Sequence, residues 1–149
     1  MRALAGFMAV CAVFLAPFAA RADDPIVFKV VDGAIPEPLT SQPGDPASGR
    51  TVMLTGKLGN CIACHKVPAL KEADFQGEIA PSLDGVANRY TTAQLRLIVS
   101  NAKLKFPGTV MPAFHRNVGL KRVAPEYEGK PILTSQQVED VVAFLKTFN

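Results

Sequence analysis

The stretch LGNCIACHKVP, residues 58–68, decides the fold of this chain because it concentrates residue types that are scarce elsewhere. The sequence of 149 residues has three cysteines and two histidines, yet Cys61, Cys64 and His65 stand within five positions. Two thiols on one turn of backbone, followed directly by an imidazole, form a group suited to holding a cofactor. We therefore expect the rest of the chain to fold around what this group holds.

The spacing Cys-x-x-Cys-His is typical of c-type haem attachment. Cys61 and Cys64 can add to the two vinyl groups of the porphyrin, and the adjacent His65 can then coordinate the iron through Nε2. A disulfide is one alternative, but a thioredoxin-like dithiol is expected in a βαβ setting that the sequence lacks. A zinc site is another, but neighbouring Cys64 and His65 cannot readily supply two corners of one tetrahedron. The motif predicts one covalently attached haem c.

Residues 1–22 have the layout of a secretory signal peptide. Arg2 precedes an apolar run over residues 4–20, and residues 20–22 form a small-x-small cleavage site. The run is short for a membrane span, and an uncleaved anchor is the alternative. Cleavage would leave residues 23–149, enough for one domain, with no later apolar run long enough to span a bilayer. We expect the mature chain in the periplasm, with no membrane span.

The charge balance of the mature chain excludes one class of partner. Without Arg2 and Arg21 the 16 basic residues fall to 14, against 13 acidic residues, which gives a net charge of +1. A near-neutral exported domain argues against nucleic acid as a partner.

The mature chain divides into an arm and a domain. Residues 23–44 are rich in proline and glycine and include a β-branched run, residues 26–31, that suggests one short strand. Residues 45–149 carry the cysteine motif and the signals for three helices, the first of which Gly59 could end. Helices joined by loops predict an all-α domain. The helix starts are marked by Asp45 before Pro46, by Thr91 with Gln94, and by Thr134 with Gln137.

An iron with ligands on both haem faces needs a second axial ligand, for which the mature chain offers Met53, Met111 and His115. Met53 lies on the helix that leads into the motif, so we interpret it as a core residue. Met111 stands in a loop, because Pro112 disfavours helix at the residue before it. We favour Met111 as the ligand, which would leave His115 at the surface or behind the ligand.

The order of these features resembles that of the class I cytochromes c. A helix, the Cys-x-x-Cys-His motif, residues 79–83 (IAPSL), a helix, Met111-Pro112 and a final helix follow one another as in that family. The resemblance implies an all-α domain around one covalent haem, here preceded by the N-terminal extended arm, and axial ligation of the iron by His65 and Met111.

The same resemblance implies roles for residues around the haem. The Pro81 carbonyl would accept a hydrogen bond from Nδ1–H of His65, which fixes the imidazole tautomer, and Leu83 would pack on the haem. Ala80 stands where the family usually has glycine. The first and last helices would cross closely at Gly49, against residues 144–145.

A narrower resemblance rests on residues 32–50 and 128–145, which are similar to the SoxX family, the monohaem subunits of the SoxAX cytochromes of bacterial sulfur oxidation. It implies a heterodimer with a SoxA-type cytochrome subunit and transient contact with the SoxYZ carrier. The complex, an L-cysteine S-thiosulfotransferase, joins thiosulfate oxidatively to a cysteine of SoxYZ. This subunit would pass the electrons to an acceptor cytochrome c. No catalytic residue is expected in the chain itself, because both mature cysteines hold the haem.

Three questions stay open. The chain could instead be a free-standing soluble carrier of the periplasm, or a sensing haem protein with an open distal site, which Met111 argues against. The arm, residues 25–44, either covers its own domain or, as we hypothesise, extends onto SoxA. Basic residues around the Met111 loop are either solvated or steer an acidic partner; they are Lys103, Lys105, Arg116, Lys121 and Arg122.

Overall fold

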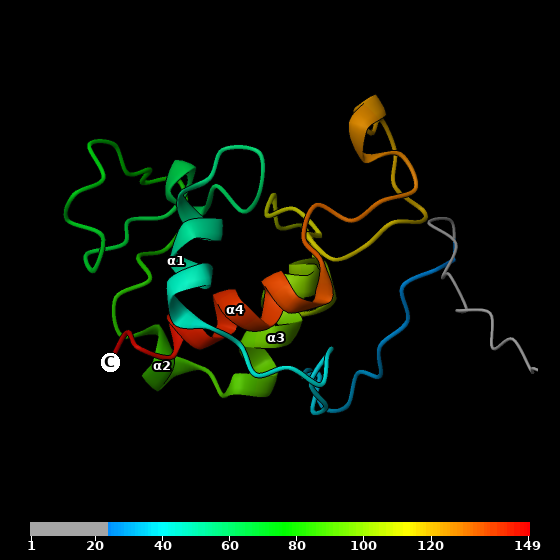
Figure 1. Ribbon diagram of the computed structural model, residues 1–149, viewed down its shortest axis with the longest axis horizontal. Coiled ribbons are helices and arrows are strands. Elements are labelled where there is room, and N and C mark those ends of the chain that lie inside the picture. The colour runs from blue at the N-terminus through cyan, green and yellow to red at the C-terminus, as the bar shows by residue number, and fades with distance from the viewer. Residues whose placement is uncertain (1–23) are drawn as a thin grey trace, which may run out of the picture.

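The computed structural model describes residues 24–149, which form helices and long loops (Figure 1). No strand occurs in that range, which confirms the predicted all-α class, and the run expected as a short strand makes only an isolated bridge between Val31 and Ala34. The predicted signal peptide, residues 1–22, lies outside the described residues. The α-helices are α1 (Pro46–Leu54), α2 (Val86–Arg89), α3 (Thr92–Asn101) and α4 (Ser135–Leu145), and the 3-10 helices are η1 (Cys61–Ala63), η2 (Ala102–Leu104) and η3 (Pro125–Tyr127).

The three longer helices begin where the sequence predicts, because each N-terminus is capped by the expected side chain. Thr91 and Thr134 each complete a capping box with the glutamine three residues later. Asp45 caps α1 and accepts hydrogen bonds from the hydroxyl and the backbone N–H of Ser48, at 2.7 and 2.9 Å. These hydrogen bonds lower the pKa of the Asp45 carboxyl.

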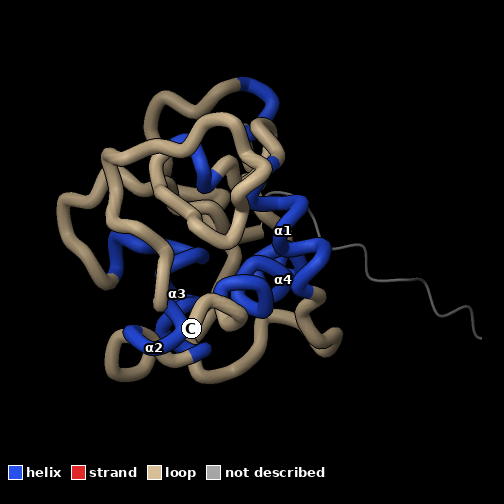
Figure 2. Tube along the Cα trace, turned by 90° about the vertical axis from the view of Figure 1, so that its left-hand side faces the viewer, coloured by secondary structure: helices blue, strands red, loops and turns tan. Residues whose placement is uncertain are grey.

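One apolar core joins α1, α3 and α4 to the loops that follow the cysteine motif. Figure 2 shows the α-helices gathered in one half of the molecule, with long loops making up most of the other half. In residues 24–149 no helix is long and apolar enough to cross a membrane. The largest fully buried members of this core are Met53, Val67, Leu70, Leu95, Leu133, Val138, Val141 and Val142.

Helices α1 and α4 cross at glycines. A methyl group built on Gly49 would overlap the carbonyl oxygen of Asp140 and lie 3.0 Å from Cβ of Phe144. A methyl group on Gly44, just before α1, would overlap the carbonyl oxygen of Glu139. The crossing at Gly49 is therefore as close as the sequence predicts, and it is centred about one turn earlier on α4 than residues 144–145.

The N-terminal arm lies along its own domain, which is one of the two arrangements that the sequence left open. Figure 1 shows it passing from the right-hand edge beneath α3 and α4 to the start of α1. Ile35 is 2% exposed, and its N–H donates to the carbonyl of Ala93 at 3.0 Å. Nearer the start of the arm, the N–H of Ile26 donates to Oδ1 of Asn117 at 3.0 Å.

A buried ion pair between α3 and α4 also binds the backbone of the arm. Arg96 of α3 donates from Nε to Oε1 of Glu139 of α4 at 2.6 Å, and the two side chains are 6% and 8% exposed. Arg96 also donates to the carbonyl of Ile35 at 2.8 Å, and Oε1 of Glu139 accepts the N–H of Leu39 at 2.8 Å. The two charges thus satisfy backbone groups of the arm as well as each other, which a buried pair needs in order not to destabilise the fold.

The helix crossing predicts the outcome of Gly49→Ala. Helix propensity alone would favour alanine by roughly 0.5–1 kcal/mol. Overlap with the Asp140 carbonyl should cost more, about 1–3 kcal/mol, because α4 must move away. Denaturant unfolding should therefore show a net loss of stability. Gly56→Ala is the control, since nothing lies within 4 Å of a methyl group there; equal stability of the two variants would contradict the close crossing.

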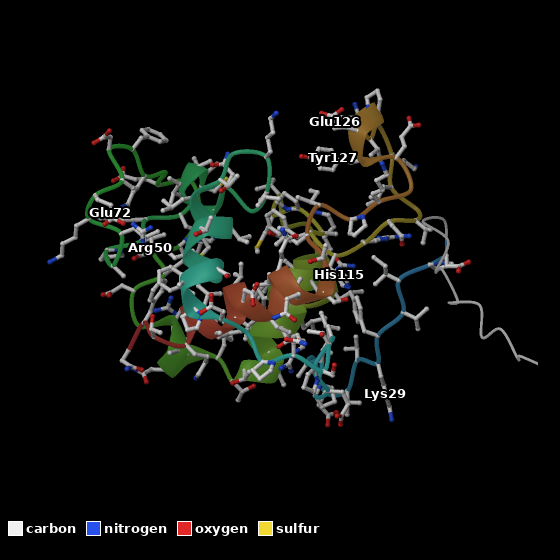
Figure 3. The ribbon with its side chains drawn as sticks, viewed as in Figure 1. Lys29, Arg50, Glu72, His115, Glu126 and Tyr127 are labelled. Carbon is white, nitrogen blue, oxygen red and sulfur yellow. The ribbon has the colours of Figure 1, made fainter. Side chains whose placement is uncertain are left out.

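The buried pair predicts a large effect of Glu139→Gln. Removing the carboxylate leaves the Arg96 cation buried without its partner, which should cost about 3 kcal/mol of unfolding free energy. The arm should also become more susceptible to proteolysis. The exposed pair of Arg50 and Glu72 provides the control (Figure 3), and Glu72→Gln should cost at most about 1 kcal/mol. Similar costs for both substitutions would show that the buried pair does not hold the arm.

Candidate functional site

A turn between the end of α1 and η1 folds back on α1 and sets the position of the cysteine motif. That helix ends at Leu54, earlier than the expected Gly59, because the next residue is extended with φ −82° and ψ 118°. Gly59 instead donates its N–H to the carbonyl of Val52 at 3.1 Å. Asn60 then adopts the left-handed conformation, with φ 46° and ψ 38°, which asparagine tolerates better than most residues. The turn brings η1, with Cys61, to the end of α1.

A second segment, residues 77–83, runs along the motif and is hydrogen-bonded to it. Its N–H groups at Gly77, Ala80 and Leu83 donate to the carbonyls of residues 62, 64 and 66, at 2.7, 3.0 and 2.9 Å. Three backbone carbonyls in and just after the motif are thereby satisfied within the protein. This pairing fixes the position of the cysteine turn and of the histidine that follows it.

The pairing also brings the imidazole of His65 to the carbonyl of Pro81. Nδ1 of His65 lies 2.6 Å from that oxygen, so Nδ1–H is the donor and Nε2 is the nitrogen without this proton. A carbonyl at this distance fixes the orientation and the tautomer of the ring, as around metal-bound histidines. Leu83, at the end of the same segment, packs against the apolar core.

Gly77, which begins this segment, and Gln76, which precedes it, were not predicted from the sequence. Gly77 is buried, and a methyl group on it would overlap the carbonyl oxygen of Ala63, so only glycine lets the segment approach the motif so closely. The side chain of Gln76 accepts the N–H of Val67 at 2.6 Å and donates to the carbonyl of Leu70 at 2.7 Å. A lone glycine and a lone glutamine in a loop carry no sequence signal, because these contacts depend on the fold.

The cysteine thiols are free, which bears on the two alternatives to haem. Cys61 and Cys64 form no disulfide. Burial raises the pKa of the Cys61 thiol to about 12, which opposes the deprotonation that zinc binding requires. In the described part of the chain no three His, Cys, Asp or Glu side chains converge on a possible metal position. The described residues therefore offer no set of ligands for zinc at this site.

Two large apolar side chains next to predicted haem-site residues in the sequence are exposed. Ile79, beside the paired Ala80, is 77% exposed, and Val110, beside Met111, is 85% exposed. Met111 itself is half-buried and packs against the core. Large apolar side chains left in water are what a haem would cover when it is attached at the two thiols. The free thiols and the oriented imidazole complete a set of residues that fits haem c.

Met53 and His115, the other two candidates for the second axial position, are occupied elsewhere. Met53 is fully buried in the core. His115 is 4% exposed, where the sequence allowed it a place at the surface, and Figure 3 shows it beside the start of α4. Its Nδ1 donates to the carbonyl of Leu133 at 2.8 Å, and its Nε2 lies 3.3 Å from Oγ of Ser135. Both imidazole nitrogens therefore have partners within the protein.

Three of the five basic residues near Met111 make hydrogen bonds to backbone carbonyls of this chain. Lys103 donates to the carbonyls of Thr109 and Met111. Lys105 donates to Gly33 of the arm at 3.4 Å, and Arg116 donates to Val118 at 2.8 Å. These three side chains therefore contact the backbone of this chain as well as water.

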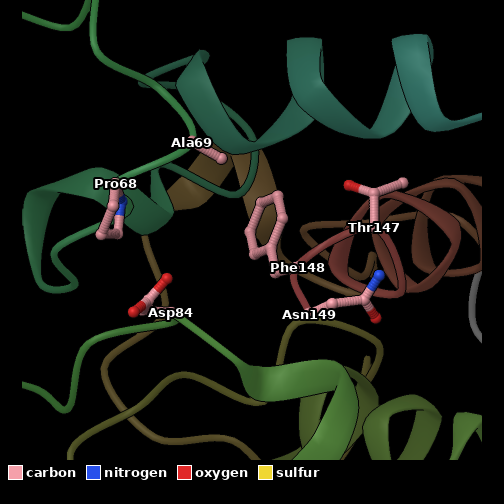
Figure 4. Close-up of a pocket in the computed structure, with 6 residues that line it drawn as sticks. All are labelled: Pro68, Ala69, Asp84, Thr147, Phe148 and Asn149. Carbon is pink, nitrogen blue, oxygen red and sulfur yellow. The ribbon is translucent and has the colours of Figure 1, made fainter.

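A cavity of about 290 Å³ lies next to the residues that follow the motif and the paired segment (Figure 4). None of the cysteines, His65 or Met111 lines it, and it brings together no group of catalytic residues. Its lining consists of Pro68, Ala69, Asp84, Thr147, Phe148 and Asn149.

Comparisons with known proteins show the family of the chain. The family model of cytochrome c matches residues 47–149. The crystal structure of SoxXA from P. pantotrophus contains a similar chain, with 49% sequence identity and a TM-score of 0.76, over 83% of this chain and 93% of that one. A search of curated proteins finds no match. The chain belongs to the cytochrome c family, with Cys61 and Cys64 as the residues that attach its haem c.

Proposed function

We propose that this chain is the SoxX-type electron-transfer subunit of a periplasmic SoxAX cytochrome. The observation that carries the electron-transfer role is the pairing of residues 77–83 with the motif, which holds His65 ready to bind iron. The 49% identity to a chain of the SoxXA structure supports the assignment to this complex. When bound, haem iron changes between the ferric and ferrous states and so carries one electron.

The residues of the chain bind and orient this group. Cys61 and Cys64 would attach the haem, and Nε2 of His65 and the sulfur of Met111 would bind the iron. The Pro81 carbonyl accepts Nδ1–H of His65 and so leaves Nε2 free as a ligand. Leu83 would pack against the haem and help to exclude water. With thioether and imidazole as the two ligands, the reduction potential is higher than with two imidazoles.

The partners follow from the same assignment. A SoxA-type cytochrome subunit forms a heterodimer with this chain and carries the chemistry at sulfur. The SoxYZ carrier binds transiently as the acceptor of thiosulfate, and an acceptor cytochrome c takes the electrons away. The chain brings no catalytic residue of its own. Large apolar side chains remain exposed for contact with a partner; they include Phe75, Leu104, Phe106 and Val118.

The ligand assignment predicts that Met111→Ala removes the weak far-red sulfur-to-iron band from the spectrum of the oxidised protein. The reason is that His115 and Met53 have other contacts and cannot replace the lost sulfur. His115→Gln and Met53→Leu are the controls, and both should keep the band. Persistence of the band in Met111→Ala, with loss in Met53→Leu, would give the second axial position to Met53.

The partner assignment predicts what accompanies the native protein. Purification of the tagged chain from its own host under mild conditions should yield a second c-type cytochrome in equal amount. Size exclusion at micromolar concentration should keep the two together, as expected of a stable heterodimer. Elution of the tagged chain alone would contradict the proposal and favour the free-standing carrier.

A further inference from the structure

Lys103 is tied to the loop that carries Met111. Its Nζ donates to the carbonyl oxygen of Thr109 at 3.0 Å and to that of Met111 at 2.9 Å. The same loop closes on itself, since the N–H of Met111 donates to Oγ1 of Thr109 at 3.2 Å. One ammonium group thus bridges two carbonyls that flank the exposed Val110.

The backbone at Lys103 is firmly held. Lys103 lies in η2, which directly follows α3, and the preceding Ala102 is fully buried. The carbonyl of Ala102 accepts the N–H groups of Lys105 and Phe106, at 3.0 and 2.8 Å. The lysine therefore links the Met111 loop to a part of the backbone that the core immobilises.

The loop itself has open space around it. Val110 is 85% exposed, and nothing lies within 4 Å of a methyl group built on Gly108, whose φ is 84°. Hydrogen bonds from a charged donor are stronger than those between neutral groups. A lysine that joins two carbonyls of such a loop to the end of α3 restricts the positions that Met111 can take.

We propose that Lys103 is a positioning residue for Met111: it holds residues 109–111 so that the Met111 sulfur stays on the haem iron. The inference rests on the proposed function, in which Met111 is the sixth ligand. Because Lys103 is exposed, water competes for its ammonium group, and we expect a moderate effect and not the loss of the ligand. The contact acts through the backbone carbonyls and not through the charge alone.

Imidazole binding to the oxidised, haem-loaded protein tests this proposal, since imidazole binds only when the Met111 sulfur leaves the iron. Lys103→Gln should raise the imidazole affinity about threefold to tenfold and weaken the far-red band. Lys103→Arg, which keeps donors for both carbonyls, should restore values near those of the native protein. Lys105→Gln is the matched control, because it removes the same charge two residues away, where the lysine contacts Gly33 of the arm.

The proposal would be overturned if Lys103→Gln bound imidazole with the affinity of the native protein. It would also be overturned if Lys105→Gln raised the imidazole affinity as much as Lys103→Gln, because this would indicate a general effect of charge. Should Lys103→Gln load haem poorly, Lys103→Ala repeats the measurement, with the same outcomes expected. Met111→Ala separates the two proposals. If its band persists, the ligand assignment fails; if its band is lost and Lys103→Gln matches the native protein, only the role of Lys103 fails.

Discussion

The arrangement of the site depends on the backbone pairing between the cysteine motif and residues 77–83. Three N–H groups of that segment donate to alternate carbonyls of the motif, and the close approach is possible because residue 77 is glycine. The pairing fixes Pro81 against Nδ1 of His65 at 2.6 Å. Without it the histidine would have no fixed direction, because η1 alone determines the position of the backbone but not that of the imidazole.

The helices provide the frame in which this pairing can persist. The crossing of α1 and α4 at Gly49 fixes the helix end from which the motif emerges, and the ion pair of Arg96 and Glu139 joins α3, α4 and the arm. The second loop, with Met111, starts from the end of α3. A rigid frame suits electron transfer, since an iron whose ligands move little between oxidation states changes its charge with little reorganisation of its surroundings.

Local signals made much of this predictable. The capping boxes at Thr91 and Thr134 placed two helix starts, and the Cys-x-x-Cys-His spacing indicated the cofactor, because both patterns act over a few residues. Contacts between distant residues could not be predicted in this way. Glu139 binds the N–H of Leu39 across 100 positions, and the need for glycine at Gly77 arises only when residue 63 lies against it. The expected strand over residues 26–31 does not form: Ile26 donates to the side chain of Asn117, and Val31 makes an isolated bridge with Ala34 in place of a ladder with another strand.

Residues 77–83 are bound to the cysteine motif and hold His65, and amide hydrogen exchange of the haem-loaded protein, resolved residue by residue by NMR, measures this directly. We expect slow exchange at Gly77, Ala80 and Leu83, close to that of amides in α3 and α4, because their N–H groups are bonded to the motif. Exchange at these three amides as fast as in the exposed loop at Val110 would contradict this pairing.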